Sequence, residues 1–81
     1  MVTAATDRVL DARGLKCPLP VIKTRMALNK MAVGEVLIVL ATDPASNIDI
    51  RHLCNITGHQ LMDAREEDGV LTFVIRKGEE G

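Results

Sequence analysis

A cysteine that stands directly before two prolines is the side chain of this sequence best placed to do chemistry. Cys17 is followed by Pro18, Leu19 and Pro20, and then by an amphipathic run. Proline suits the first turn of a helix, because its φ is already fixed and an N–H there has no intrahelical partner. We therefore expect Pro18 to be the first helical residue, with the sulfur of Cys17 near the positive end of the helix dipole.

Basic residues flank this cysteine on both sides in the sequence. Arg13 and Lys16 precede it, and Lys23 and Arg25 follow it. Cations and a helix N-terminus together lower the pKa of a thiol and so increase the nucleophilic thiolate form. The pattern predicts that Cys17 is a reactive thiol with a lowered pKa. The alternative is an unreactive cysteine beside an ordinary helix start.

The remaining cysteine and the two histidines do not complete a catalytic or metal-binding set. A cysteine hydrolase needs a base beside its thiol, whereas His52 is expected inside a helix and His59 at the start of a strand. The spacing contains neither a Cys-x-x-Cys pair nor the compact histidine pair of zinc sites. We predict no metal and no cofactor. Cys54 lies on an apolar helix face, which favours a small buried residue over a redox partner for Cys17.

The composition indicates one small domain over residues 1–81, with loose ends at 1–6 and 78–81. Phe73 is the only aromatic residue and the net charge is −1, which disfavours direct nucleic-acid binding by base stacking or by a basic surface. No apolar run reaches the roughly 20 residues needed to cross a membrane, and the first residues do not resemble a signal peptide. We expect a cytoplasmic monomer with reduced thiols and no membrane contact.

Apolar patterning and turn signals predict six elements. In chain order they are a strand over 7–11, a helix over 18–32, a strand over 36–41, a helix opened by Asp43-Pro44 and closed by Gly58, and strands over 59–66 and 70–76. Asp68-Gly69 marks a hairpin turn between the last two strands. The order β-α-β-α-β-β predicts an α+β fold, a two-layer α/β sandwich with two helices on one face of a four-stranded mixed sheet.

Two of these strands carry a more specific prediction. A strand, a long helix and a second strand imply that the first two strands are parallel. The run over 36–41 is apolar throughout, which predicts a central strand covered on both faces or nearly so.

The first helix carries two apolar stripes at helical spacing. The stripe expected to face the core consists of Val21, Thr24, Leu28 and Met31. The other consists of Leu19, Ile22 and Met26. It is either a docking face for partner proteins or part of a broad core stripe with scattered surface methyl groups. Gly34 is expected to cap the end of this helix. The inner face of the second helix is expected to comprise Ile50, Leu53, Cys54 and Thr57.

The residues around the cysteine also carry a family resemblance. The segment from Leu10 to Pro20, Leu-Asp-Ala-Arg-Gly-Leu-Lys-Cys-Pro-Leu-Pro, matches every fixed position of the motif Leu-Asp-x-x-Gly-x-x-Cys-Pro-x-Pro. It resembles the signature of the TusA/SirA-like sulfur carrier (sulfurtransferase) family, whose fold is the sandwich expected above. The similarity extends over almost the whole chain, through Gly34-Glu35, Asp43-Pro44-Ala45, Asp49-Ile50 and Gly58-His59.

A single nucleophilic cysteine without a base or a metal suits a group carrier better than a self-contained enzyme. The resemblance implies that Cys17 accepts sulfane sulfur as a persulfide and passes it to a downstream acceptor protein. It implies a cysteine desulfurase or a rhodanese-like protein as donor, and an acceptor in tRNA thiolation, molybdenum cofactor supply or sulfur oxidation. The alternatives are a redox-sensing or regulatory protein-interaction domain that uses the same cysteine, and an interaction domain in which the cysteine is structural.

The residues expected to support the persulfide lie close to Cys17 in the sequence or at the same edge of the sheet. They are Arg13, Lys16, Pro18, Pro20, Lys23, Arg25 and Asp43. Asp43 is included because the resemblance places an Asp-Pro pair in the surround of the reactive loop, and capping of the second helix is its alternative role. The residues expected to bind partners are Leu19, Ile22 and Met26.

Overall fold

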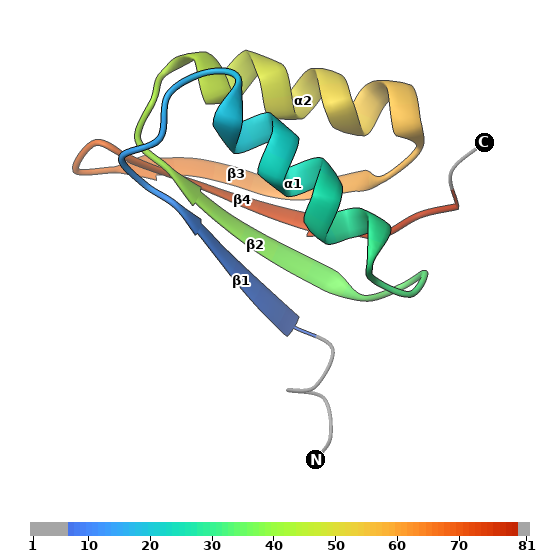
Figure 1. Ribbon diagram of the computed structural model, residues 1–81. Helices are drawn as coiled ribbons and strands as arrows, with labels where there is room; N and C mark the ends of the chain where they lie inside the picture. The colour runs from blue at the N-terminus through green and yellow to red at the C-terminus, as the bar shows by residue number, and fades with distance from the viewer. Residues whose placement is uncertain (1–6, 80–81) are drawn as a thin grey trace.

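Two helices cover one face of a four-stranded sheet (Figure 1). The structure is a computed structural model that describes residues 7–79. Its elements are β1 (Asp7–Ala12), α1 (Leu19–Asn29), β2 (Val36–Ala41), α2 (Ala45–Thr57), β3 (Gln60–Glu67) and β4 (Val70–Arg76). The predicted α+β two-layer fold is confirmed. Of the ends expected to be loose, residues 1–6 and 80–81 lie outside the described residues. No helix within 7–79 is long and apolar enough to span a bilayer.

The sheet order is β1-β2-β4-β3, so β2 and β4 are central and β1 and β3 are the edges. β1 and β2 are parallel, as predicted, from the pair Asp7 and Val36 to the pair Ala12 and Ala41. β4 runs antiparallel to both β2 and β3. Because the carboxyl ends of β1 and β2 meet at one edge, the connections that lead into α1 and α2 leave the sheet together. This places the segment that contains Cys17 beside the start of α2.

β2 is a central strand of the sheet, as predicted. The prediction that it is covered on both faces, or nearly so, is wrong. Alternate residues from Leu37 to Ala41 are buried, and those between them are only partly buried. Both helices lie on the same face of the sheet (Figure 1), so no second layer of described residues covers the other face. A continuous apolar run predicts a buried strand but does not distinguish coverage on one face from coverage on both.

Helix α1 is shorter than predicted at both ends. It begins at Leu19 with Pro18 as the N-cap, one residue later than expected. It ends at Asn29 with Lys30 as the C-cap, earlier than expected. The N–H groups of Lys30 and Met31 bond to carbonyls three residues back, and this tightening closes the last turn.

Gly34 does not cap α1, contrary to the prediction. It lies in the turn that leads into β2, where its φ of 96° is in the left-handed region that favours glycine. Its N–H donates to the carbonyl of Lys77 at 2.8 Å, which joins the start of β2 to the end of β4.

The core lies between the helices and the sheet and is aliphatic apart from Phe73. The predicted inner stripe of α1 is confirmed, since Thr24, Leu28 and Met31 are buried and Val21 packs against them. The predicted inner face of α2 is buried as well. Truncation of a buried leucine to alanine costs about 2–5 kcal/mol in such cores. This packing therefore fixes both helices over the sheet, and with them the residues at their N-terminal ends.

Two turn predictions are confirmed by the backbone. Gly58 ends α2 with a φ of 82°, and its N–H donates to the carbonyl of Cys54 at 3.2 Å. Asp68 and Gly69 have φ values of 52° and 81°, and two successive left-handed residues are what a type I′ hairpin turn requires. β3 and β4 are therefore joined as a tight hairpin.

Candidate functional site

Cys17 lies in the connection between β1 and α1, and its side chain is exposed. It precedes Pro18, the N-cap of α1. The N–H of Leu19 donates to the carbonyl of Lys16 at 2.8 Å, and the two prolines of this turn have no N–H. The first turn of α1 therefore offers the thiol fewer free donors than its place before a helix would suggest.

Asp43 ties the cysteine loop to the start of α2. This helix begins one residue later than predicted, at Ala45 after the N-cap Pro44. The Oδ2 of Asp43 accepts a hydrogen bond from the backbone N–H of Cys17 at 2.6 Å, and its Oδ1 accepts one from Ala45 at 3.1 Å. These two backbone hydrogen bonds lower the pKa of Asp43, and the charge of Lys16 acts in the same direction. One carboxylate thus holds both the helix start and the cysteine backbone.

The side chain of Cys17 faces a second acid. Its Sγ donates a hydrogen bond to Oδ2 of Asp49 at 3.0 Å. This bond raises the pKa of Cys17, and desolvation and the negative charges of Asp49 and Asp43 add to the rise. The predicted lowering of the Cys17 pKa is therefore wrong. The acids on the α2 side act on the sulfur more strongly than the cations that flank it in the sequence.

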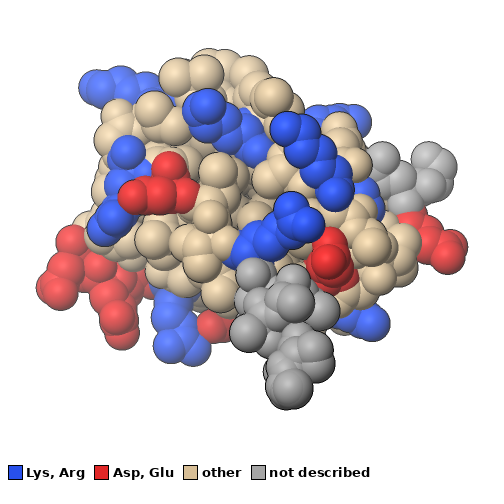
Figure 2. Space-filling view, turned by 60° about the horizontal axis from the view of Figure 1, so that its bottom comes forward, with Lys and Arg blue, Asp and Glu red and all other residues tan. Residues whose placement is uncertain are grey.

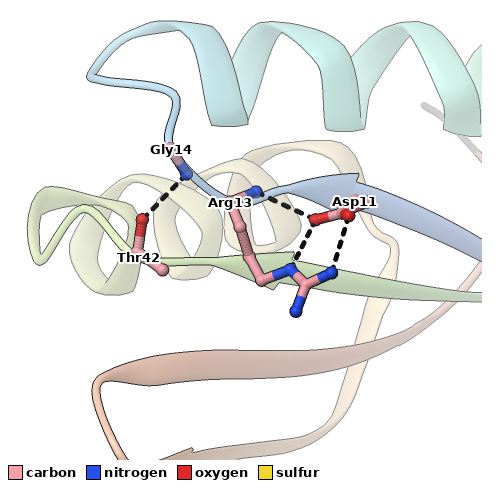
Figure 3. Close-up of polar contacts among 4 residues, drawn as sticks. All are labelled: Asp11, Arg13, Gly14 and Thr42. Carbon is pink, nitrogen blue, oxygen red and sulfur yellow. Dashed lines mark hydrogen bonds and ion pairs between the residues drawn. The ribbon is translucent and has the colours of Figure 1, made fainter.

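Arg13, one of those cations, is paired with Asp11. Figure 3 shows its guanidinium turned back toward the Asp11 carboxylate, with Nε to Oδ1 and Nη2 to Oδ2 both at 2.8 Å. The side-chain hydrogen bonds lower the pKa of Asp11 to about 2 and raise the pKa of Arg13. In the same view, the N–H of Gly14 donates to Oγ1 of Thr42 at 2.9 Å, a further tie between the two connections. Arg13 therefore braces the end of β1 and brings no uncompensated positive charge to the thiol.

Cys17 opens into a hollow of about 320 Å³ between α1 and α2. The side chains that line it are Cys17, Pro18, Val21, Arg25, Asp49, His52, Leu53 and Ile56. Most of this lining is apolar, and its charged groups lie on opposite helices. The hollow can therefore accept a side chain of an approaching protein next to the sulfur.

The structure separates the other cations expected near Cys17. Arg25 shares the hollow with the thiol. Lys16 lines a neighbouring hollow together with Asp43. Lys23 lines a hollow on the other side of α1, toward β1, that shares no residue with the one around Cys17. Arg25 and Lys16 thus lie near the cysteine loop, as expected, whereas Lys23 does not.

The sequence does not indicate Asp49 as a site residue, and it predicts His52 as a residue along the second helix. Both line the hollow around Cys17, together with Leu53 and Ile56. These four positions are spaced i, i+3, i+4 and i+7, so they share one face of α2. This spacing in the sequence, together with the parallel pairing of β1 and β2, is the signal that indicates a helix face directed at Cys17. Among the described residues, no hydrogen bond links His52 to the thiol, so Asp49 is the side chain that Cys17 contacts.

His59 and Cys54 belong to the interior. His59 is buried, and its Nδ1 accepts the N–H of Gly78 at 3.1 Å, which holds the chain that follows β4. Cys54 is a buried free thiol, and burial raises its pKa. The predictions of a satisfied polar histidine and a small buried cysteine are confirmed. Within residues 7–79, no three His, Cys, Asp or Glu side chains are grouped as metal ligands.

The second apolar stripe of α1 faces solvent. Leu19, Ile22 and Met26 are exposed to 44%, 45% and 55%, so these three side chains lie outside the buried core. Ile56 of α2 is exposed to 60% where it lines the hollow around the thiol. Apolar side chains are therefore exposed on both helices, inside the hollow around the thiol on α2 and outside it on α1.

Comparison with known proteins places this site in a family. The family model for Sulfurtransferase TusA matches residues 8–77. A putative sulfur carrier protein of Neisseria meningitidis is 51% identical over 70 residues, which cover 86% of this chain and 95% of that protein. The sulfur carrier protein TusA of Allochromatium vinosum is 46% identical over 71 residues, covering 88% and 93%. The solved structure of a SirA-like protein from Desulfitobacterium hafniense has a TM-score of 0.79 at 32% identity and covers 89% of this chain and 99% of that one. Because the match runs from β1 through β4 and includes Cys17, the chain belongs to the TusA sulfurtransferase family.

Proposed function

We propose that this chain is a sulfur carrier that holds sulfane sulfur as a persulfide on Cys17. The observation that carries the proposal is an exposed thiol positioned by two carboxylates from the α2 side, Asp43 and Asp49. Within the described residues, the thiol is hydrogen-bonded to the carboxylate of Asp49 and to no histidine, unlike the Cys–His pair of a cysteine hydrolase. The relatives named as sulfur carriers support the same role. We regard the chain as a relay partner that contributes an accessible sulfur.

Loading is an exchange of one sulfur atom between two cysteines. The Cys17 thiolate attacks the outer sulfur of a donor persulfide, so that a new S–S bond forms on Cys17 while the S–S bond of the donor breaks. The donor cysteine leaves with the bonding electron pair and takes up the proton that Cys17 has lost. Delivery to an acceptor thiol is the same exchange with Cys17 as the leaving group. The number of S–S bonds is unchanged in each step, so neither step needs an oxidant or a reductant.

Asp49 gives the unloaded carrier a resting state. Its hydrogen bond with Sγ favours the protonated thiol of Cys17, which is a weak nucleophile. We infer that exchange begins when a docked partner offsets the charge of Asp49. A persulfide extends the side chain by one S–S bond of about 2.05 Å. The outer sulfur then reaches further into the hollow, where the guanidinium of Arg25 is available to its negative charge.

The exposed apolar surface on the two helices that follow the connections at the thiol suits successive partners. Leu19, Ile22 and Met26 on α1 and Ile56 on α2 provide this surface without any cost to the core. Donor and acceptor must reach the same sulfur, so we propose that they dock here in turn. We propose a cysteine desulfurase or a rhodanese-like protein as donor, and an acceptor in tRNA thiolation, molybdenum cofactor supply or sulfur oxidation, all in the cytoplasm.

The raised pKa of Cys17 weighs against a redox sensor that uses the same cysteine. Sensor cysteines are exposed and have a low pKa, because the thiolate is the form that peroxides oxidise. The hydrogen bond to Asp49 works in the opposite direction here. A carrier is less affected, because its reaction takes place inside a complex in which the partner can change the charge around the sulfur.

Cyanide tests the proposal, because it removes the outer sulfur of a persulfide as thiocyanate. The chain is incubated with a cysteine desulfurase and cysteine, separated from the desulfurase and from small molecules, and treated with cyanide. We expect one thiocyanate per chain from the wild type and from C54S, and none from C17S. Absence of thiocyanate from the wild type, with a rhodanese-type donor tried as well, would contradict the proposal.

A further inference from the structure

A second hollow lies on the opposite side of α1 from Cys17, between that helix and the edge strand β1. Its apolar lining includes Leu10, Met26 and Leu37, of which Leu37 is fully buried and Met26 is 55% exposed. Its charged lining is basic and consists of Arg8, Lys23 and Lys30. This hollow shares no residue with the one around the thiol, so it is a separate feature of the surface.

The charged side chains that line this hollow are all positive. The Nη2 of Arg8 lies 3.9 Å from Oε1 of Glu35, and this carboxylate offsets part of the charge of Arg8. Lys23 and Lys30 form no ion pair with any residue that the structure describes. Figure 2 shows a face of the molecule on which Lys and Arg side chains are spread over uncharged surface, with Asp and Glu side chains between some of them. Unpaired cations around an apolar depression attract carboxylates that come with an apolar neighbour.

The strand beside this hollow has an open edge. Among residues 7–79, β1 pairs with β2 alone, so half of its backbone N–H and C=O groups have no strand partner in the part of the chain that the structure describes. Within Arg8–Ala12, β1 carries neither a proline nor a bulge, and Val9 is 65% exposed. The other edge strand, β3, is interrupted by an irregularity between Leu61 and Asp63, a feature that hinders strand addition. Open backbone groups on β1 are satisfied best by a second polypeptide in extended form.

We propose that this hollow binds an extended acidic segment of a partner protein, which adds to the open edge of β1. Apolar side chains of the segment would pack against Met26 and Leu10, and its carboxylates would pair with Lys23 and Lys30. A nucleic acid fits less well, because its phosphates cannot pair with a strand edge and the chain offers no aromatic side chain here for stacking. The site does not use Cys17 and shares only Met26 with the docking surface proposed above. The inference therefore goes beyond the sulfur-carrier role and does not rest on it.

A labelled peptide tests the charge requirement. The probe is fluorescein-labelled Glu-Val-Glu-Leu-Glu-Val-Glu, titrated by fluorescence anisotropy with the wild type and with C17S. We expect both proteins to bind equally, and K23E/K30E to bind at least about tenfold more weakly. The matched control is R51E/R65E, which makes the same change in net charge on α2 and β3, at residues outside this hollow. Its affinity is expected to stay within about twofold of the wild type, because separated surface charges are screened by salt.

Hydrogen exchange tests strand addition. We expect the bound peptide to slow amide exchange within Arg8–Ala12 and to leave β3 unchanged. The inference would be overturned by any of three results: no binding to the wild type, equal weakening in the control, or binding without protection of β1. Tighter binding of an oligothymidylate of equal charge would overturn it as well. A dimer of the wild type that K23E/K30E abolishes would assign the hollow to a second copy of the chain instead.

Discussion

The thiol of Cys17 donates a hydrogen bond to the carboxylate of Asp49, with 3.0 Å between Sγ and Oδ2. The two residues lie far apart in the sequence and meet because β1 and β2 are parallel, so that the connections into α1 and α2 leave the same edge of the sheet. Asp43 secures the backbone of Cys17 at the same point, with 2.6 Å between the N–H nitrogen and Oδ2. The reactive loop of this carrier is therefore positioned by α2 as much as by the helix that follows it.

Replacing Asp49 by asparagine is expected to lower the pKa of Cys17. The change removes both the charged hydrogen-bond acceptor and its electrostatic effect on the thiolate. Each unit of decrease multiplies the thiolate fraction at neutral pH by about ten, and the rate of alkylation rises with it. The measurement is the iodoacetamide rate as a function of pH. Asp63→Asn is the control, because Asp63 is a partly exposed acid that pairs with Arg65 on β3. An unchanged pH profile in Asp49→Asn would show that the hydrogen bond does not set the reactivity of the thiol.

Replacing Asp43 by asparagine is expected to lower the thermal midpoint at neutral pH and to have less effect in acid. The pKa of Asp43 is lowered in the folded state, so its carboxylate stabilises the fold above its ordinary value of 3.8. That stabilisation is lost as the pH falls through the lower, folded-state pKa. Thermal unfolding followed by circular dichroism at pH 7 and at pH 2.5 tests this. An equal difference from the wild type at both pH values would show that the charge of Asp43 is not what stabilises the loop.

The two apolar stripes of α1 are expected to respond differently to truncation. Leu28 is fully buried, so Leu28→Ala is expected to lower the free energy of unfolding by about 2–5 kcal/mol. Met26 is 55% exposed, so Met26→Ala is expected to change it by less than about 0.5 kcal/mol. Urea denaturation measures both. Comparable losses in the two variants would mean that the outer stripe contributes to the core after all.

A charge on the outer stripe is expected to slow sulfur transfer from a protein donor. Ile22→Glu places a carboxylate in the apolar surface that we propose for docking, and a buried unpaired charge there opposes association. We expect at least about tenfold slower loading by a cysteine desulfurase, and unchanged loading by inorganic polysulfide, which needs no docking.

The control for this variant is Val33→Glu, at a residue that is 60% exposed and lies beyond the end of α1. It is expected to load at the wild-type rate with either donor. If both variants slow loading by the desulfurase to the same extent, the effect is one of net charge and the stripe is not the docking face.

The fold could be predicted from the sequence because its signals are local or periodic. Residue spacing predicts the inner stripe of α1 and the inner face of α2. Backbone preference predicts the end of α2 at Gly58 and the turn at Asp68-Gly69. The ends of α1 could not be placed to the residue, because Pro18 tolerates both the N-cap and the first helical position. The coverage of β2 depends on where other elements pack, and its apolar run does not record that.

The site was only partly predictable, because charges that are close in the sequence are not the charges that reach the sulfur. Arg13 lies near Cys17 in the chain but turns to Asp11, whereas Asp49 comes from another element and contacts the thiol. The Asp11–Arg13 pairing had a signal, since residues two apart at the end of a strand point to the same side. The position of Asp49 required the parallel pairing and the face of α2 to be considered together.

The most direct test of the sulfur-carrier role is the intact mass of the protein after incubation with a cysteine desulfurase and cysteine, before and after reduction. The wild type and C54S are expected to gain one sulfur, roughly 32 Da, that reductant removes and that peptide mapping places on Cys17. C17S is expected to gain nothing while keeping its fold. A wild-type protein that gains no sulfur from either a desulfurase or a rhodanese-type donor, or a gain that persists in C17S, would contradict the carrier role of Cys17.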